Sequence, residues 1–267
     1  MILIFLVNLT AIYSCFAQFD EKFYFPSKEW HSIENMEFTE MNFRIDKDTI
    51  NTVLFNSKTT TKATIIYYHG TGGNISVNTS AAKLLTNEGF QVFMIDFRGY
   101  GKSTGKPTHL NIANDAQTIF DKIIVKDEFK NYPIIVYGAS IGTQIATKIT
   151  RDNKDKISAL ILDGTISSFT DMALLSVPKE QKEMISTYVT SPYSAIEDIK
   201  HIESIPKLFI HSKEDKPVPF SQAEAVYSNA HEPKVFWVYE GKHLESVSKF
   251  QKEYVQKINL LYGDIIN

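Results

Sequence analysis

The stretch that most constrains this chain is residues 132–147, which read YPIIVYGASIGTQIAT. Its first half is a short apolar run typical of a buried strand, and a helical pattern begins just beyond Ser140. Between the two lies G-x-S-x-G, from Gly138 to Gly142. A serine on so tight a turn has a strained backbone, and the residues two positions to either side must be small for strand and helix to pass. The turn therefore pushes the Ser140 hydroxyl out above a sheet, where the first N–H groups of the helix face any negative charge that forms.

Strand and helix patterns alternate along the rest of the chain and predict an α/β fold. Residues 36–45 and 49–57 flank a charged turn and predict an antiparallel hairpin. Apolar runs follow at residues 63–68, 90–95, 133–137, 159–162, 207–210 and 235–239, and helical patterns at 81–87, 112–125, 141–150, 221–228 and 246–262. We therefore predict eight strands in a mostly parallel sheet with helices on both faces.

Composition limits the size and the partners of the fold. A chain of 267 residues with 43% hydrophobic content can bury one large core, so residues 18–267 are predicted to form a single domain. The net charge of −3 comes without a basic block, which disfavours nucleic acid and anionic membrane surfaces as partners. A small neutral or mixed molecule is the expected substrate, and the sequence does not indicate an oligomeric state.

The start of the chain resembles an export signal. Residues 1–17 carry no charge, are mostly apolar, and are too short and too interrupted by polar residues to span a bilayer. Small residues at Cys15 and Ala17 match a cleavage site ahead of Gln18, although the usual early Lys or Arg is missing. We predict a signal peptide and an exported protein, periplasmic or secreted. The alternatives are a lipoprotein anchored through Cys15 and a buried first strand or helix of the domain.

Reactive side chains follow three of the predicted strands. In open α/β sheets, ligands bind beyond the carboxyl ends of the strands. Ser140, Asp215 and His243 follow the fifth, seventh and eighth strands, in the order nucleophile, acid, base. A serine hydroxyl needs a histidine to take its proton, and the histidine needs a carboxylate to orient it. Asp163, after the sixth strand, is the second candidate for the acid.

Five motifs in this order resemble α/β-hydrolase-fold serine hydrolases, in the compact branch of serine aminopeptidase-like proteins and small esterases and lipases. They are YYHGTGGN at 67–74, DFRGYGKSTG at 96–105, GASIG at 138–142, HSKEDKPVP at 211–219 and GKH at 241–243. The resemblance runs from about residue 65 to the C-terminus. It implies that Asp215 is the acid, that His243 is the base, and that the N–H groups of Thr71 and Ile141 hold the oxyanion. Ser212 and Thr143 depart from the small residues usual at their positions.

Other tempting residues are better explained as structural. His69 and His211 end strands and are expected to be structural histidines. Lys102, Ser103 and Thr104 imitate the end of a phosphate loop, but that motif needs glycine where Asp96 stands. The scattered histidines do not have the spacing of metal ligands, so we expect neither a metal nor a cofactor.

The predicted activity is hydrolysis of carboxylic esters through an acyl-enzyme on Ser140. A peptidase or amidase with the same triad is the first alternative, and a non-catalytic binding protein of the same fold is the second. Residues 164–205 hold more apolar material than a crossover helix needs and form either a small lid or an ordinary crossover. A lid this short leaves no room for a deep tunnel, which predicts short to medium acyl chains. Its expected wall residues are Met172, Leu175, Met184 and Tyr188.

Overall fold

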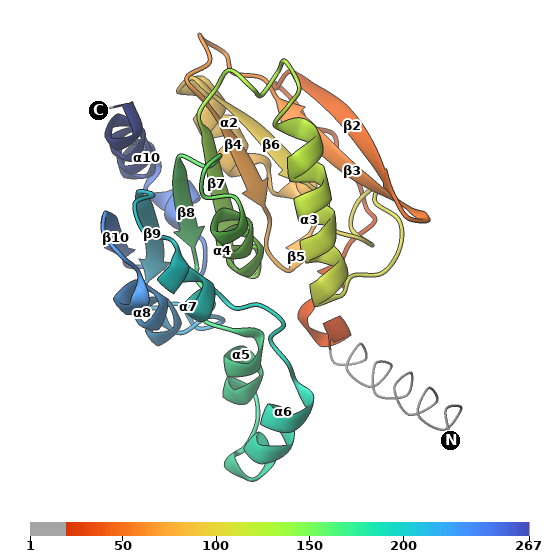
Figure 1. The fold of residues 1–267 in the computed structure, drawn as a ribbon, viewed down its shortest axis with the longest axis vertical. Coiled ribbons are helices and arrows are strands. Elements are labelled where there is room, and N and C mark those ends of the chain that lie inside the picture. The colour runs from red at the N-terminus through yellow and green to blue at the C-terminus, as the bar shows by residue number, and fades with distance from the viewer. Residues whose placement is uncertain (1–19, 267) are drawn as a thin grey trace.

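The computed structural model describes residues 20–266 (Figure 1). The segment that the sequence analysis assigns to a signal peptide, with Cys15, lies outside the described residues, so export and lipidation stay predictions. Among residues 20–266, no helix has both the length and the apolar character that crossing a bilayer requires.

The centre of the molecule is a single eight-stranded sheet, as predicted. Along the sheet, the strand order is β10-β9-β8-β7-β4-β6-β3-β2. The hairpin of β2 and β3 is antiparallel, β3 is antiparallel to β6, and the five other neighbouring pairs are parallel. The strands are β2 (Phe38–Ile45), β3 (Asp48–Phe55), β4 (Ala63–Tyr68), β6 (Phe90–Ile95), β7 (Ile134–Ala139), β8 (Ala159–Asp163), β9 (Lys207–Ser212) and β10 (Lys234–Tyr239).

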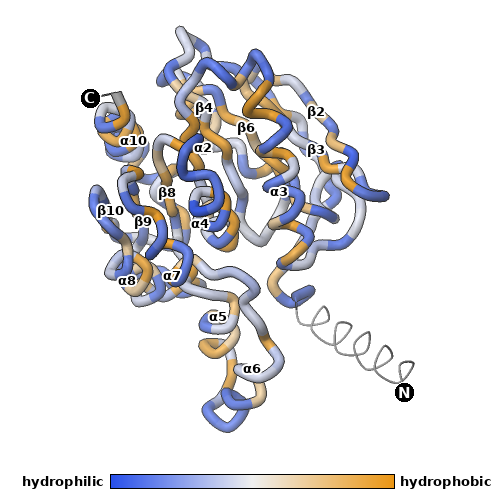
Figure 2. The backbone as a smooth tube through the Cα atoms, viewed as in Figure 1, coloured by the Kyte–Doolittle hydropathy of each residue, from blue (hydrophilic) through white to orange (hydrophobic). Residues whose placement is uncertain are grey.

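Burial explains why these strands are readable in the sequence. Strands β4, β6, β7, β8 and β9 are buried at every residue, as expected for parallel strands covered on both faces, and they appear as continuous apolar runs. The edge strand β2 is mostly exposed and alternates instead. Figure 2 shows the hydrophobic residues concentrated along the central strands.

Helices cover both faces of the sheet. One core contains side chains of α3 (His109–Ile123), α4 (Gly142–Asp152) and α8 (Phe220–Asn229). The other contains side chains of α2 (Thr79–Asn87) and α10 (Gln251–Ile266). The predicted helix over 246–262 is broken at Phe250, whose backbone is not helical, so a short α9 (Ser246–Lys249) precedes α10.

The segment between β8 and β9 contains several short helices. These are α5 (Phe169–Leu175), η3 (Lys179–Gln181), α6 (Lys182–Tyr188), α7 (Ala195–Asp198) and η4 (Ile199–His201). Helices α5 and α6 stand away from the sheet in Figure 1, whereas α7 lies back toward α4. The segment thus has an outlying pair of helices followed by a return to the body of the domain.

The structure at the N-terminal end of the described residues was not predicted from the sequence. Residues 20–27, here called the N-terminal strap, contain η1 (Glu21–Phe23) and β1 (Phe25–Pro26). β1 pairs in parallel with β5 (Gly72–Gly73) in the loop after β4. At two residues each, these strands are too short to leave a periodic pattern in the sequence.

Candidate active site

Ser140 lies on the sharp turn between β7 and α4. Its φ angle is 53°, the left-handed conformation that a side chain rarely adopts. A Cβ added to Gly138 would lie 2.5 Å from the carbonyl oxygen of Gly142, and one added to Gly142 would lie 2.2 Å from the carbonyl oxygen of Tyr68. Both glycines are therefore required by contact. For Gly138 the contact is with the helix of the same turn, as the motif predicts, whereas for Gly142 it is with the end of β4.

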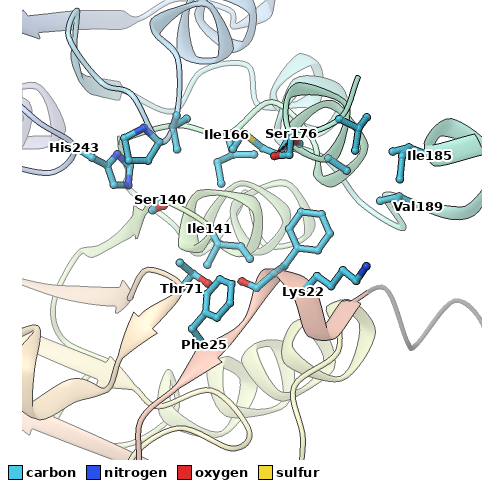
Figure 3. A pocket seen from close by; sticks show the side chains of 16 residues that line it. Lys22, Phe25, Thr71, Ser140, Ile141, Ile166, Ser176, Ile185, Val189 and His243 are labelled. Atoms are coloured by element: carbon cyan, nitrogen blue, oxygen red, sulfur yellow. Dashed lines mark hydrogen bonds between the residues drawn. The ribbon is translucent and has the colours of Figure 1, made fainter. Parts of the chain in front are cut away.

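Asp215 and His243 are joined although 28 positions separate them in the sequence. His243 Nδ1 lies 2.5 Å from Asp215 Oδ2, and Asp215 Oδ1 accepts the Val218 N–H at 2.8 Å. Asp215 is buried, and its two carboxylate oxygens contact a backbone N–H and the imidazole. This bond assigns the Nδ1 proton to the Asp215 side and leaves Nε2 as the nitrogen for a reacting group. Figure 3 shows His243 and Ser140 at the same end of one cavity.

Gly164 is a residue of the site that the sequence analysis did not single out. Its φ angle is 66°, and a Cβ there would lie 2.6 Å from His243 Cε1. The imidazole therefore packs directly on the backbone after β8. In the sequence, its position directly after the predicted strand that ends near Asp163 was the one feature that could have indicated a role at the site.

Asp163, the second candidate for the acid, lies beneath the serine turn. Its carbonyl oxygen accepts the Ser140 N–H at 2.8 Å. Its Oδ2 accepts the hydroxyls of Tyr137 at 2.8 Å and Ser246 at 3.2 Å. Burial raises the pKa of Asp163 to about 6. The side chain is thus bonded to hydroxyl groups, whereas the carboxylate bonded to His243 is that of Asp215.

The two other histidines at strand ends hold loops. His69 Nδ1 donates to the carbonyl oxygen of Gly70 at 2.7 Å, and burial lowers the pKa of His69 to about 4. His211 is also buried, and its Nε2 lies 2.9 Å from the carbonyl oxygen of Val218. Each has the surroundings of a structural histidine next to a site loop.

The predicted oxyanion residues, Thr71 and Ile141, line the same cavity as Ser140. Within residues 20–266, neither N–H donates a hydrogen bond to another group. The Thr71 carbonyl oxygen accepts the Tyr100 hydroxyl at 2.6 Å and the Phe25 N–H at 3.0 Å. The Thr71 hydroxyl donates to the carbonyl oxygen of Phe23. The N-terminal strap and Tyr100 thus hold the Thr71 loop in place.

Ser140 and His243 open into a cavity of about 460 Å³ (Figure 3). In Figure 3 they lie at one end, and Ile185 and Val189 of the α6 region lie at the other. Apart from Lys22, the wall beyond the site is mostly apolar. It comprises Lys22, Phe23, Phe25, Ile166, Met172, Ala173, Ser176, Val177, Ile185, Val189, Pro217 and Val218.

The predicted wall residues need correction. Met172 lines the cavity, but Leu175, Met184 and Tyr188 do not, and each is about half exposed. On α6, the pair Met184 and Tyr188 and the pair Ile185 and Val189 have the same spacing of four residues, so both satisfy a helical stripe. The prediction chose the wrong pair, because only packing against the body of the domain decides which stripe faces inward.

No group of three metal-ligating side chains gathers anywhere in residues 20–266. Asp96 and Arg98, from the loop after β6, hold neighbouring backbone and carboxylates instead. Asp96 accepts the Ile75 N–H at 2.7 Å, and Arg98 bonds to Asp115 and Asp48. These contacts brace the loops next to the site.

Comparisons relate this chain to known proteins. The family described as Serine aminopeptidase, S33, matches residues 59–191. The uncharacterized protein YfhR of Escherichia coli (strain K12) is 32% identical over 188 residues, which cover 70% of this chain and 64% of that protein. The lysophosphatidylserine lipase ABHD12 of Macaca fascicularis is 30% identical over 183 residues, which cover 63% of this chain and 45% of that protein.

A solved structure shares the fold over nearly the whole chain. The Pyrococcus furiosus esterase Pf2001 superposes with a TM-score of 0.73 at 15% identity, over 90% of this chain and 98% of the esterase. Together these findings show that the chain has the α/β-hydrolase fold. Its match spans less than two thirds of the length of the curated relatives named here.

Proposed function

We propose that this protein is a serine hydrolase that cleaves carboxylic esters of short to medium acyl chains through an acyl-enzyme on Ser140. One observation carries the proposal. Ser140, a histidine bonded to a buried carboxylate, and the residues Thr71 and Ile141, whose N–H groups are the predicted oxyanion donors, line one mostly apolar cavity. This is the set of groups that acyl transfer requires.

The reaction follows from the roles of these groups. His243 takes the Ser140 proton while the serine oxygen bonds to the ester carbonyl carbon, and the resulting oxyanion is held by the N–H groups of Thr71 and Ile141. The bond from carbon to the alcohol oxygen then breaks, and His243 gives its proton to the departing alcohol. Water repeats the sequence on the acyl-enzyme, which releases the acid and the free serine.

The acyl chain has a place in the apolar part of the cavity. Its volume lies within the range of small-molecule pockets. Each buried methylene contributes about 0.8 kcal/mol. The affinity for an ester therefore rises with acyl-chain length only while the added methylenes are still buried against the cavity wall. We therefore expect kcat/KM for p-nitrophenyl esters to rise and then level off at medium length. A value that keeps climbing through long-chain esters would show that the channel is deeper than proposed.

The alternative activities are separated by two measurements. The matching family description favours a peptidase, whereas the mostly apolar wall of the cavity suits an acyl chain. Aminoacyl-nitroanilides tested beside the esters will distinguish the two activities. A fluorophosphonate probe should label the wild type and leave Ser140→Ala unlabelled, whereas an unlabelled wild type would favour a non-catalytic binding protein.

A further inference from the structure

The loop after β4 carries Thr71, whose N–H is a predicted oxyanion donor, and it contacts the nucleophile at one end. A Cβ added to Gly70 would lie 3.4 Å from Ser140 Cβ, so the backbone at Gly70 lies against the serine. The Gly70 carbonyl oxygen accepts a hydrogen bond from His69 Nδ1 at 2.7 Å. Because a peptide unit is planar, this bond fixes the plane that also contains the Thr71 N–H.

The peptide plane on the other side of Thr71 is held from outside the loop. The Thr71 carbonyl oxygen accepts the hydroxyl of Tyr100 at 2.6 Å and the N–H of Phe25 at 3.0 Å. The same Phe25 N–H lies 3.0 Å from the Tyr100 hydroxyl oxygen, so the three groups contact one another. The Thr71 hydroxyl donates to the carbonyl oxygen of Phe23. Thr71 is thus fixed through both adjacent peptide planes and through its side chain.

The N-terminal strap, which supplies two of these contacts, is itself bound at both ends. Near its start, Asp20 accepts the His109 N–H at 2.9 Å, and the Tyr24 hydroxyl lies 2.8 Å from His109 Nδ1. At its end, the Ser27 N–H donates to the Gly73 carbonyl oxygen at 3.2 Å. The strap therefore connects the loop after β4 to α3, a helix of the main core.

We propose that the N-terminal strap and Tyr100 position the Thr71 N–H for the oxyanion, so that turnover depends on backbone and hydroxyl groups away from the reacting atoms. The inference rests on the proposed function and adds positioning residues to the same site. Residues 70–73 read GTGG, a sequence with much backbone freedom, so the orientation of Thr71 depends on bonds from neighbouring segments. Removing one oxyanion donor costs about 10²–10³ in kcat. Loosening a donor should cost a smaller factor, because the N–H is still present.

The first test is Tyr100→Phe, which removes one hydroxyl and keeps the buried ring. The Phe25 N–H and the Thr71 carbonyl oxygen remain bonded to each other, so the variant should fold. We expect kcat to fall about fivefold to tenfold for both p-nitrophenyl acetate and octanoate, with little change in KM, since acylation and deacylation each pass through an oxyanion. Tyr193→Phe is the matched control and should keep the wild-type kcat. Its buried hydroxyl donates to the His109 carbonyl oxygen at 2.9 Å, outside the cavity.

A transition-state analogue measures the oxyanion site separately from the amount of folded protein. When octyl trifluoromethyl ketone binds, the Ser140 oxygen bonds to the ketone carbon, the serine proton passes to His243, and the former carbonyl oxygen becomes the oxyanion. The inhibition constant should rise in Tyr100→Phe by the same factor by which kcat/KM falls. Active sites are counted with the fluorophosphonate probe, so that loss of folded protein is not read as loss of turnover.

A second pair of variants tests the bond between the strap and the Thr71 side chain. Thr71→Val loses the hydroxyl that donates to the Phe23 carbonyl oxygen, and Thr71→Ser keeps it. Thr71→Val should therefore lower kcat more than Thr71→Ser does, and this comparison decides the question if Tyr100→Phe fails to fold.

The outcomes separate this inference from the proposed function. The inference is overturned if Tyr100→Phe keeps the wild-type kcat, if it acts through KM or chain-length preference, or if Tyr193→Phe loses as much turnover. Equal losses in the two Thr71 variants overturn it as well. Each of these results leaves the wild type an esterase, whereas failure of the wild type to cleave any ester overturns the proposed function.

Discussion

The two ends of the apolar cavity are built in different ways. At the reactive end, Ser140 and Asp215 are 6% and 5% exposed and are held by backbone hydrogen bonds and close glycine contacts. At the distal end, α6 presents Ile185 to the cavity, while its neighbour Met184 is 47% exposed. The first end is positioned by the sheet and the second by side-chain packing of short helices.

This difference indicates which end of the cavity should control turnover and which end should control substrate preference. A group held by several backbone contacts stays in place when a neighbour changes, so damage at the reactive end should lower kcat. A wall made of side chains from separate elements changes shape with single substitutions, so damage there should alter KM and chain-length preference. The expected effects below decrease from the reactive end to the wall.

The largest effect is expected for Ser140→Ala. Losing the nucleophile leaves only oxyanion and binding effects, so esterase activity should fall by about three to six orders of magnitude. His243→Ala should be as damaging, and the double variant should add little. The measurement is kcat/KM for a p-nitrophenyl ester, with Ser248→Ala, an exposed serine outside the cavity, as control. Near wild-type turnover by Ser140→Ala would remove the assignment of the nucleophile.

The next effect separates the two buried carboxylates. Asp215→Asn should lower kcat by about two to four orders of magnitude, because the bond from His243 Nδ1 would no longer be made to a carboxylate and the favoured tautomer would change. Asp163→Asn should lower kcat less, since its bonds run to the Tyr137 and Ser246 hydroxyls. Circular dichroism must show both variants folded. If Asp163→Asn were the more harmful, the acid would have to be moved to the end of β8.

Asp163→Asn should also change how the free energy of unfolding depends on pH. The pKa of Asp163 is raised to about 6 from an ordinary 3.8, so the folded protein keeps a proton that the unfolded chain releases. Stability from this group is therefore lost as pH rises from about 4 to about 6. Chemical denaturation across this range should find Asp163→Asn gaining up to about 3 kcal/mol relative to the wild type. A constant difference would show that Asp163 titrates normally.

Gly164→Ala should disturb the histidine without removing it. A methyl group at this position meets His243 Cε1 at 2.6 Å and sits on a left-handed backbone, so the imidazole must shift. We expect kcat to fall about tenfold or more with little change in KM, since small misplacements of catalytic groups are costly. Gly263→Ala is the control, because a Cβ there meets nothing within 4 Å. Equal behaviour of the two variants would mean that the contact does not position His243.

The smallest effects are expected at the distal wall. Ile185→Ser places a hydroxyl in the apolar cavity and should reduce the preference for octanoyl over acetyl esters about fivefold, with little effect on acetyl turnover. Met184→Ser, one position along α6 and exposed, should leave the chain-length profile unchanged. Kinetics on p-nitrophenyl acetate and octanoate measure both. A larger change for Met184→Ser would show that Met184 and Tyr188, as first predicted, form the wall.

The sequence by itself determined the features that depend on near neighbours. Period and length of the apolar runs predicted all eight strands of the main sheet. The five fully buried parallel strands appear as continuous apolar runs, and the exposed edge strand β2 appears by its alternation. The close contacts of Gly138 with Gly142, Thr143 and Ala146 followed from the sterics of one tight turn, whereas Gly142 packs on the backbone of Tyr68 at the end of a different strand. The grouping of Ser140, Asp215 and His243 followed from their places after three parallel strands, since the carboxyl ends of parallel strands share one edge of the sheet.

Only the tertiary structure decided the features that join distant parts of the chain. The strap reaches the Thr71 loop through Phe23, 48 positions away, and two-residue strands leave no period to read. Gly164 meets His243 from another loop, and the inward stripe of α6 is chosen by what packs against it. Periodicity specifies that a helix has an apolar side, but when two stripes are equally apolar the buried one is set by the surfaces that the fold brings together.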